Sequence, residues 1–109
     1  MTSRSAWLAM SLTLVGLVAP GLAAAGDAAR GAKLAYTCHG CHGIPSYKNS
    51  YPVYSVPKLG GQHAAYMVAA LKGYAGPDRA HATMHAQAAT MSEQDMQDIA
   101  AYLAGQELK

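Results

Sequence analysis

The sequence predicts a single all-α domain of three main helices and loops. Apolar residues recur at helical spacing in separate segments, good capping residues precede two of them, and the intervening stretches are rich in proline and glycine. The chain has 109 residues, of which 13% are charged, with a formal net charge of +2. This length bounds the fold to one domain, and the weak charge excludes the strong basic field that a nucleic-acid partner requires.

Residues 1–25 resemble an export signal and are excluded from the fold. Arg4 gives the start a positive charge, and an uncharged run over residues 6–19 follows it. This run has roughly 14 residues, fewer than the roughly 20 that cross a bilayer core, so we expect no permanent membrane span. Small residues precede an expected cleavage after Ala25. We therefore expect a periplasmic protein with one domain over residues 26–109.

The first helix is expected over residues 28–37. Asp27 can cap it, because a carboxylate is favoured at the end where backbone N–H groups lack partners. Leu34 and Ala35 are expected to face inward. The helix therefore leads directly into the two cysteines of the chain.

Cys38 and Cys41 belong to the pattern C-x-x-C-H, which ends at His42. Residues three apart lie on one side of a helical turn, so both sulfurs can form thioethers with the vinyl groups at one edge of a porphyrin. His42 is then carried beneath the ring, where its imidazole can ligate the iron. The pattern predicts one covalently bound haem c, and no second C-x-x-C-H is present in the sequence.

Other uses of these cysteines are weaker. A thioredoxin-like redox pair needs a βαβ context, and no alternating or β-branched run flanks the motif. A structural zinc site needs four ligands, and beyond the motif only His81 and His85 have the spacing of a ligand pair. A disulfide between Cys38 and Cys41 would close so small a loop that it would restrain little of the unfolded chain.

Residues 44–61 are expected to form a loop, because they contain three prolines, three tyrosines and a Gly-Gly pair. A structureless connection of this length is unusual unless it packs on something. The flat apolar face of a porphyrin would serve, since tyrosines can lay their rings on it and keep their hydroxyls in water.

Two more helices follow. The middle one is expected over residues 64–74, which carry apolar residues at helical spacing and end before Gly76. The last one is expected to begin at the cap Ser92 and to end near Gly105. Its signals are an acid at the third helical position, a pair of staple methionines and an inward stripe: Asp95, Met91, Met96, Ile99, Ala100 and Leu103.

These features resemble the class I c-type cytochromes, of the short single-haem bacterial kind. The resemblance covers nearly all of residues 26–109, and its most specific part is the glycine-rich start of the first helix followed by the haem motif. It implies the cytochrome c fold, with three main helices and loops wrapped around one haem. The segment from Pro57 to His63 resembles the family's proline-leucine-glycine segment. This implies that the Pro57 carbonyl orients His42 and that Leu59 also contacts the haem.

The resemblance also implies a methionine as second axial ligand, on a loop before the last helix. Met67 and Met96 lie on inward helical stripes, and Met91 is needed as the staple. Met84 lies at the family's ligand spacing in the expected loop 78–90. We therefore expect His42 and Met84 to be the metal ligands. Ligation by a second histidine, His81 or His85, is the rival.

With both axial positions filled, the chemistry that remains is the gain and loss of one electron. We expect an electron carrier, not an enzyme, acting between redox partner proteins such as a donor dehydrogenase and an acceptor oxidase or reductase. Two alternatives stay open. The first is that the chain is a haem subunit fixed within a larger dehydrogenase or oxidase complex. The second is that it is a haem protein with an open sixth position for peroxidase chemistry or gas binding.

Overall fold

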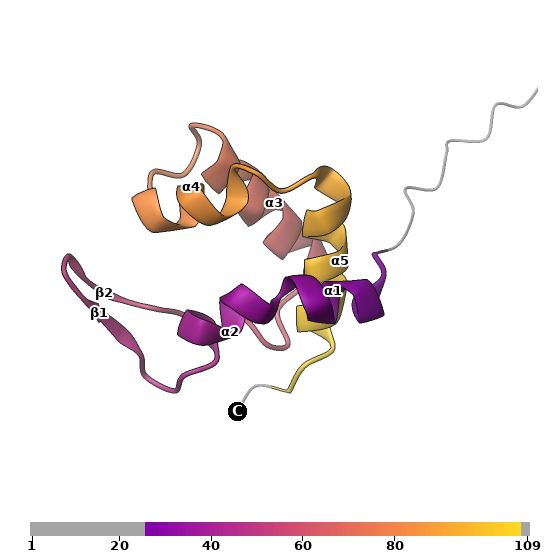
Figure 1. Cartoon of the computed structure of the whole chain (residues 1–109), viewed down its shortest axis with the longest axis horizontal. Helices are drawn as coiled ribbons and strands as arrows, with labels where there is room; N and C mark the ends of the chain where they lie inside the picture. The colour runs from indigo at the N-terminus through magenta and orange to yellow at the C-terminus, as the bar shows by residue number, and fades with distance from the viewer. Residues whose placement is uncertain (1–25, 108–109) are drawn as a thin grey trace, which may run out of the picture.

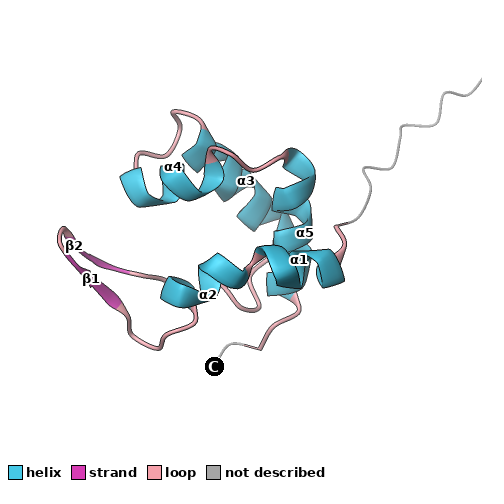
Figure 2. Cartoon of the chain, in the orientation of Figure 1, coloured by secondary structure: helices cyan, strands magenta, loops and turns pink. Residues whose placement is uncertain are grey.

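The computed structural model describes residues 26–107, so the expected export signal over residues 1–25 lies outside the described part. The elements in chain order are α1 (Ala28–Leu34), α2 (Tyr36–His42), β1 (Lys48–Ser50), β2 (Val53–Ser55), α3 (Ala64–Ala75), α4 (Ala82–Ala88) and α5 (Glu93–Ala104). Figure 2 shows that helices dominate and that the strands form a single hairpin. The predicted all-α fold class is confirmed, with more and shorter helices than expected.

The helices form two arms joined at one end by α5. This helix packs against both α1 and α3, and α4 packs against α3. In Figure 1 the arm of α1, α2 and the hairpin lies along one side, while α3 and α4 lie along the other. The haem motif on α2 therefore faces the α3–α4 arm across the molecule.

The core lies where α1, α3 and α5 meet. Its buried residues are Ala35, Met67, Ile99, Ala100 and Leu103, and Leu34, Leu59 and Met91 pack against them. The inward positions predicted from helical spacing are confirmed, whereas Leu59 and the staple residue Met91 lie outside the helices. Because few large side chains are fully buried, the core alone is small for a chain of this size.

The expected first helix is divided at Ala35. This residue has ψ 1°, and its N–H donates to Gly31 O at 2.8 Å. The Cys38 N–H then donates to Ala35 O at 3.0 Å, a tighter turn than an α-helix makes. The break turns α2 away from α1, while Ala35 stays buried in the core.

The expected loop over residues 44–61 contains the hairpin, so its prediction as loop throughout is wrong. Asn49 pairs with Tyr54 in the antiparallel register, and Tyr51 and Pro52 form the turn. The Asn49 side-chain amide closes the turn by donating to Pro52 O at 2.9 Å. Strands of three residues are too short to show the alternation of apolar and polar residues that predicts a strand from the sequence.

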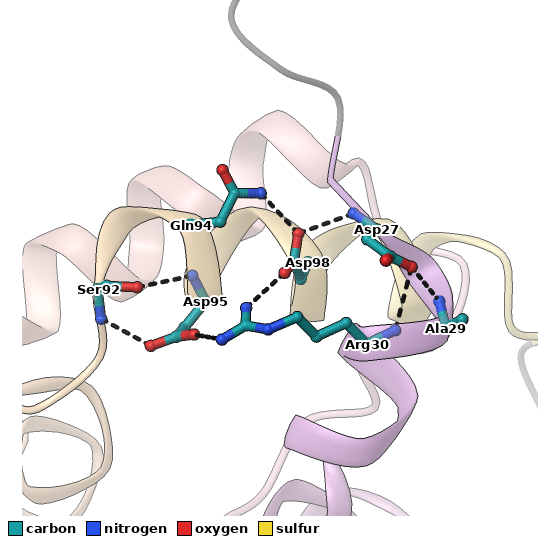
Figure 3. Close-up of polar contacts among 7 residues, drawn as sticks. All are labelled: Asp27, Ala29, Arg30, Ser92, Gln94, Asp95 and Asp98. Carbon is teal, nitrogen blue, oxygen red and sulfur yellow. Dashed lines mark hydrogen bonds and ion pairs between the residues drawn. The ribbon is translucent and has the colours of Figure 1, made fainter.

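Both predicted N-caps are present (Figure 3). An Asp27 carboxylate oxygen accepts from the N–H groups of Ala29 and Arg30 at 2.9 and 3.1 Å. Ser92 Oγ accepts from the Asp95 N–H at 3.1 Å, and an Asp95 carboxylate oxygen accepts from the Ser92 N–H at 3.0 Å. The reciprocal pair at Ser92 is a capping box, which fixes the start of α5.

A buried carboxylate joins α1 to α5 at the same place. Asp98 is 1% exposed, and its oxygens accept from Arg30 Nη1 at 2.5 Å, the Asp27 N–H at 2.7 Å and Gln94 Nε2 at 2.7 Å. Arg30 reaches Asp95 as well, at 2.6 Å. A buried charge costs free energy unless it is paired and hydrogen-bonded, and these partners satisfy Asp98 on both oxygens.

Because Asp98 is buried and ionised, we expect the fold to lose stability in acid. The Arg30 guanidinium is the first cause that lowers the pKa of the Asp98 carboxyl below its ordinary 3.8, and the Asp27 N–H and Gln94 amide add to the effect. Because the folded pKa is depressed, this stabilisation is fully present above pH 3.8 and is lost as pH falls through the folded pKa. Urea unfolding between pH 2 and pH 6 should show stability falling below about pH 4. The Asp98→Asn variant should be less stable at pH 6 and less pH-dependent; parallel curves would contradict the assignment.

Candidate functional site

A cleft of ≈ 600 Å³ lies between the two arms. It is lined by residues of α2, the hairpin, the segment after it, α3, α4 and α5. The cleft brings together every site residue predicted from the sequence: Cys38, Cys41, His42, Pro57, Leu59 and Met84. Residues far apart in the chain therefore converge on one space, of a size that small-molecule and cofactor sites commonly have.

The two cysteines lie on α2, one turn apart. Cys38 is half-buried and packs against the core, whereas Cys41 is exposed, and the two do not form a disulfide. Burial is the main cause that raises the pKa of the Cys38 thiol above its ordinary value. The environment of Cys38 therefore does not favour the thiolate that an attacking redox cysteine needs.

His42 ends α2 and is oriented by Pro57. Its Nδ1 lies 2.6 Å from Pro57 O. A carbonyl oxygen only accepts, so Nδ1 carries the proton and the lone pair of a neutral imidazole stays on Nε2. A hydrogen bond of this kind fixes the ring of a metal-binding histidine and raises its basicity.

The segment that carries Pro57 is itself held on the core. Leu59 packs against the buried cluster, and the Gly61 N–H donates to Leu103 O at 3.0 Å. Gly61 has φ 78°, a backbone conformation that glycine adopts without the steric cost of a Cβ. The C-terminal end of α5 thus sets the position of the Pro57 carbonyl beside His42.

Met84 lies on α4, so its expected placement on a loop is wrong. The helix was missed because no Ser, Thr, Asn or Asp stands at its cap position. His81 caps it instead, and its Nδ1 accepts from the Met84 N–H at 3.3 Å. Met84 is half-buried and lines the cleft from the arm opposite the cysteines.

The other methionines within residues 26–107 have packing roles. Met67 and Met96 are 5% and 4% exposed, as their inward positions predicted. Met91 packs against the core and also lines the cleft. The cleft lining thus includes three methionines, Met67, Met84 and Met91, and of these Met84 lies outside the core cluster.

The histidine rivals are less well placed. His81 lines the cleft, but its Nδ1 accepts a backbone proton, so in the neutral ring Nε2 carries the hydrogen and offers no lone pair. His85 lies outside the cleft lining, with Nδ1 2.8 Å from Tyr74 O. Within residues 26–107, no three His, Cys, Asp or Glu side chains gather to hold a metal ion, which gives the zinc interpretation no support.

The chemistry of this donor set suits haem c. Two thiols lie one helical turn apart, an imidazole beside them offers Nε2, and a thioether faces them from the other arm. The rest of the lining is largely apolar and includes core residues such as Ile99 and Leu103. The cap role of His81 could not be predicted, because histidine is not among the residues that commonly cap a helix.

Comparison with known proteins decides the family. The family model described as cytochrome c matches residues 28–107. The chain belongs to the cytochrome c family. As a cytochrome c it binds haem c covalently, and Cys38 and Cys41 fit the attachment motif. In the part of the chain that the structure describes, no helix is long and apolar enough to cross a membrane.

Individual relatives agree with the family. Cytochrome c-554(548) of Halomonas halodenitrificans is 40% identical over 86 residues, which cover 76% of this cytochrome c and 100% of the relative. Cytochrome c4 of Pseudomonas aeruginosa is 38% identical over 101 residues, 93% of this chain but 47% of the relative. The chain therefore spans about half the length of that cytochrome c4.

A solved structure shows the same fold. The crystal structure of reduced recombinant cytochrome c4 from Pseudomonas stutzeri superposes with a TM-score of 0.60 at 27% identity. The match covers 77% of this chain and 53% of the other. The two-arm arrangement around the cleft is thus that of a cytochrome c fold, and the predicted fold is confirmed.

Proposed function

We propose that this chain is a one-electron carrier with a single haem c ligated by His42 and Met84. The observation that carries the proposal is the convergence of both thiols, the oriented imidazole and the Met84 thioether on one cleft. When bound, haem c supplies an iron that gains and loses one electron. We further propose that residues 26–109 form the exported domain, that it acts in the periplasm, and that its partners are redox proteins.

Each residue has a distinct part in this function. Cys38 and Cys41 fix the cofactor covalently, and His42 binds the iron through Nε2. Pro57 holds the His42 ring and raises its basicity, while Leu59 and the core residues exclude water from the cleft. Met84 would supply a second protein ligand to the iron through its thioether sulfur. A thioether in place of a second imidazole favours the reduced iron and raises the potential.

The lining disfavours an open sixth position. Met67, Met84 and Met91 all line the cleft, so thioethers are close to a place that peroxidase chemistry or gas binding would need vacant. A filled position leaves electron transfer as the chemistry that these residues support. A haem subunit fixed within a larger complex would use the same residues in the same way.

Replacing Met84 tests the ligand assignment. Met84→Ala should abolish the long-wavelength thioether–iron band of the ferric protein, because the side chain that supplies the sulfur is gone. It should also lower the reduction potential. Met91→Ala is the matched control, since Met91 lines the same cleft but packs in the core; it should keep the band and lose some stability. Loss of the band in Met91→Ala alone would show that the assignment is wrong.

A further inference from the structure

The hairpin reaches across the cleft through Tyr54. Its hydroxyl lies 3.1 Å from Thr83 Oγ1, in hydrogen-bonding distance. The Tyr54 ring also meets the His81 ring edge to face, with centroids 4.8 Å apart and planes at 79°. Figure 1 shows the hairpin and α4 at the ends of the two arms that lie away from α5.

Both partners of Tyr54 lie in the first turn of α4. His81 caps the helix by accepting from the Met84 N–H, and Thr83 precedes Met84 directly. The residues that Tyr54 touches therefore flank Met84 on its N-terminal side. A contact that holds them also holds the start of the Met84 backbone.

Apart from Tyr54, the start of α4 is held from α3, where His85 Nδ1 lies 2.8 Å from Tyr74 O. The helix has seven residues, and its buried residue, Ala88, lies at the far end. A helix this short does not persist through its own hydrogen bonds and depends on tertiary contacts. From α3, the Tyr74 ring lies 6.0 Å from His81, and Arg79 stacks on Tyr74 at 4.5 Å. The Tyr54 contacts complete this support from the hairpin side.

Tyr54 is the hairpin side chain that contacts α4, although Tyr51, Pro52 and Ser55 also line the cleft. Tyr51 and Val53 are 95% and 76% exposed, whereas Tyr54 and its cross-strand neighbour Asn49 are half-buried and line the cleft. In a two-stranded sheet, paired residues share a face, so the register puts Asn49 and Tyr54 on the cleft side together. The hairpin thus presents one aromatic side chain to α4.

We propose that Tyr54 is a positioning residue that latches the hairpin onto α4 and keeps Met84 directed into the cleft. The latch consists of Tyr54, His81 and Thr83. The inference rests on the proposed ligation by Met84 and adds to it a role for the tyrosine-rich hairpin. Without the latch, the first turn of α4 separates from the hairpin more often, and the thioether leaves the cleft with it.

Imidazole is the probe for this motion, because it competes with a thioether for ferric iron. In the intact holoprotein, imidazole affinity is measured from the loss of the long-wavelength band. Tyr54→Phe, which removes the hydroxyl bond, should bind imidazole about threefold more tightly. Tyr54→Ala also removes the ring contact with His81 and should bind it about tenfold more tightly. Tyr36→Phe and Tyr36→Ala are the controls, because Tyr36 is 81% exposed and outside the cleft lining, and they should behave as wild type.

Two further measurements separate the latch from general stability. Thr83→Val should equal Tyr54→Phe, and the double variant should add nothing to either, because all three remove the same bond. Exchange of the Met84 amide hydrogen should quicken in Tyr54→Ala relative to amides of α5. Tyr54→Ala with wild-type imidazole affinity and wild-type Met84 exchange would overturn the latch.

The two proposals fail in different ways. If Met84→Ala keeps the thioether band, the ligand assignment is wrong, and exchange of the Met84 amide in Tyr54→Ala still decides whether the latch exists. If Met84→Ala loses the band while every Tyr54 variant matches wild type in both measurements, the latch alone is wrong.

Discussion

Replacing Cys38 and Cys41 together by serine is expected to give a colourless and largely unfolded chain. The arms enclose a cleft of ≈ 600 Å³ whose walls include core residues such as Met67, Ile99 and Leu103. Without a covalently held cofactor, water would wet these walls. The protein core is small, and a ligand that binds only the folded state stabilises it by mass action.

Circular dichroism and urea titration measure this effect. Serine keeps nearly the volume and the hydrogen-bonding capacity of cysteine, so the change removes the attachment bonds and little else. The wild type should show helix content and a cooperative unfolding transition, and the double variant should lose most of both. A colourless variant that unfolds cooperatively from a native helix content would show that the polypeptide folds without haem.

Gly31→Ala is expected to separate α1 from α5. A Cβ at Gly31 would overlap with the Asp98 backbone carbonyl, and it would lie 3.0 Å from the Tyr102 Cβ. The obstacle is backbone in a helix, which does not yield by changing a rotamer. Overpacking of this kind costs about 3 kcal/mol, which corresponds to roughly 15 °C in Tm for a domain of this size.

The same substitution at Gly105 is the control. There a new Cβ finds its first neighbour, Tyr102 O, at an ordinary 3.6 Å, and φ is −84°, which any residue adopts. Gly105→Ala should therefore leave Tm within a few degrees of wild type. Thermal unfolding of the holoprotein compares the two. Equal Tm values would mean that α1 and α5 do not cross at Gly31 as closely as described.

The helices and their caps could be predicted because their signals are local. Asp27 and Ser92 bond to N–H groups two or three residues away, and the stripe from Met96 to Leu103 repeats with the period of the helix. The break at Ala35 carries no such signal. It arises because Ala35 packs into a core built from residues more than thirty positions away.

The hairpin and α4 could not be predicted for the same reason. The strands have three residues each, and α4 has seven with a histidine as its cap. These elements depend on contacts between them, such as Tyr54 with Thr83, which are 29 positions apart. The prolines, glycines and tyrosines of these segments predicted loops. The contacts that order the hairpin and α4 come from residues far away in the sequence, so they could not be predicted from it.

The site divides in the same manner. The spacing from Cys38 to His42 is a local motif, and the structure places it on one helix. Pro57 was predicted as the partner of His42 from the resemblance to class I c-type cytochromes. Its carbonyl oxygen lies 2.6 Å from the imidazole Nδ1. The second axial ligand stays a prediction, because Met84 and Met91 both line the cleft and the sequence distinguishes them only by spacing and staple position.

Covalent attachment of haem at Cys38 and Cys41 is the claim on which the account depends. The direct measurement is the absorption spectrum of the exported protein in alkaline pyridine, oxidised and reduced, after extraction with acidified organic solvent. We predict that the colour stays with the polypeptide, that the reduced spectrum is that of a haem joined by two thioethers, and that thiol titration finds no free cysteine. A colourless chain with both thiols titratable, produced in a host that matures other c-type cytochromes, would contradict it.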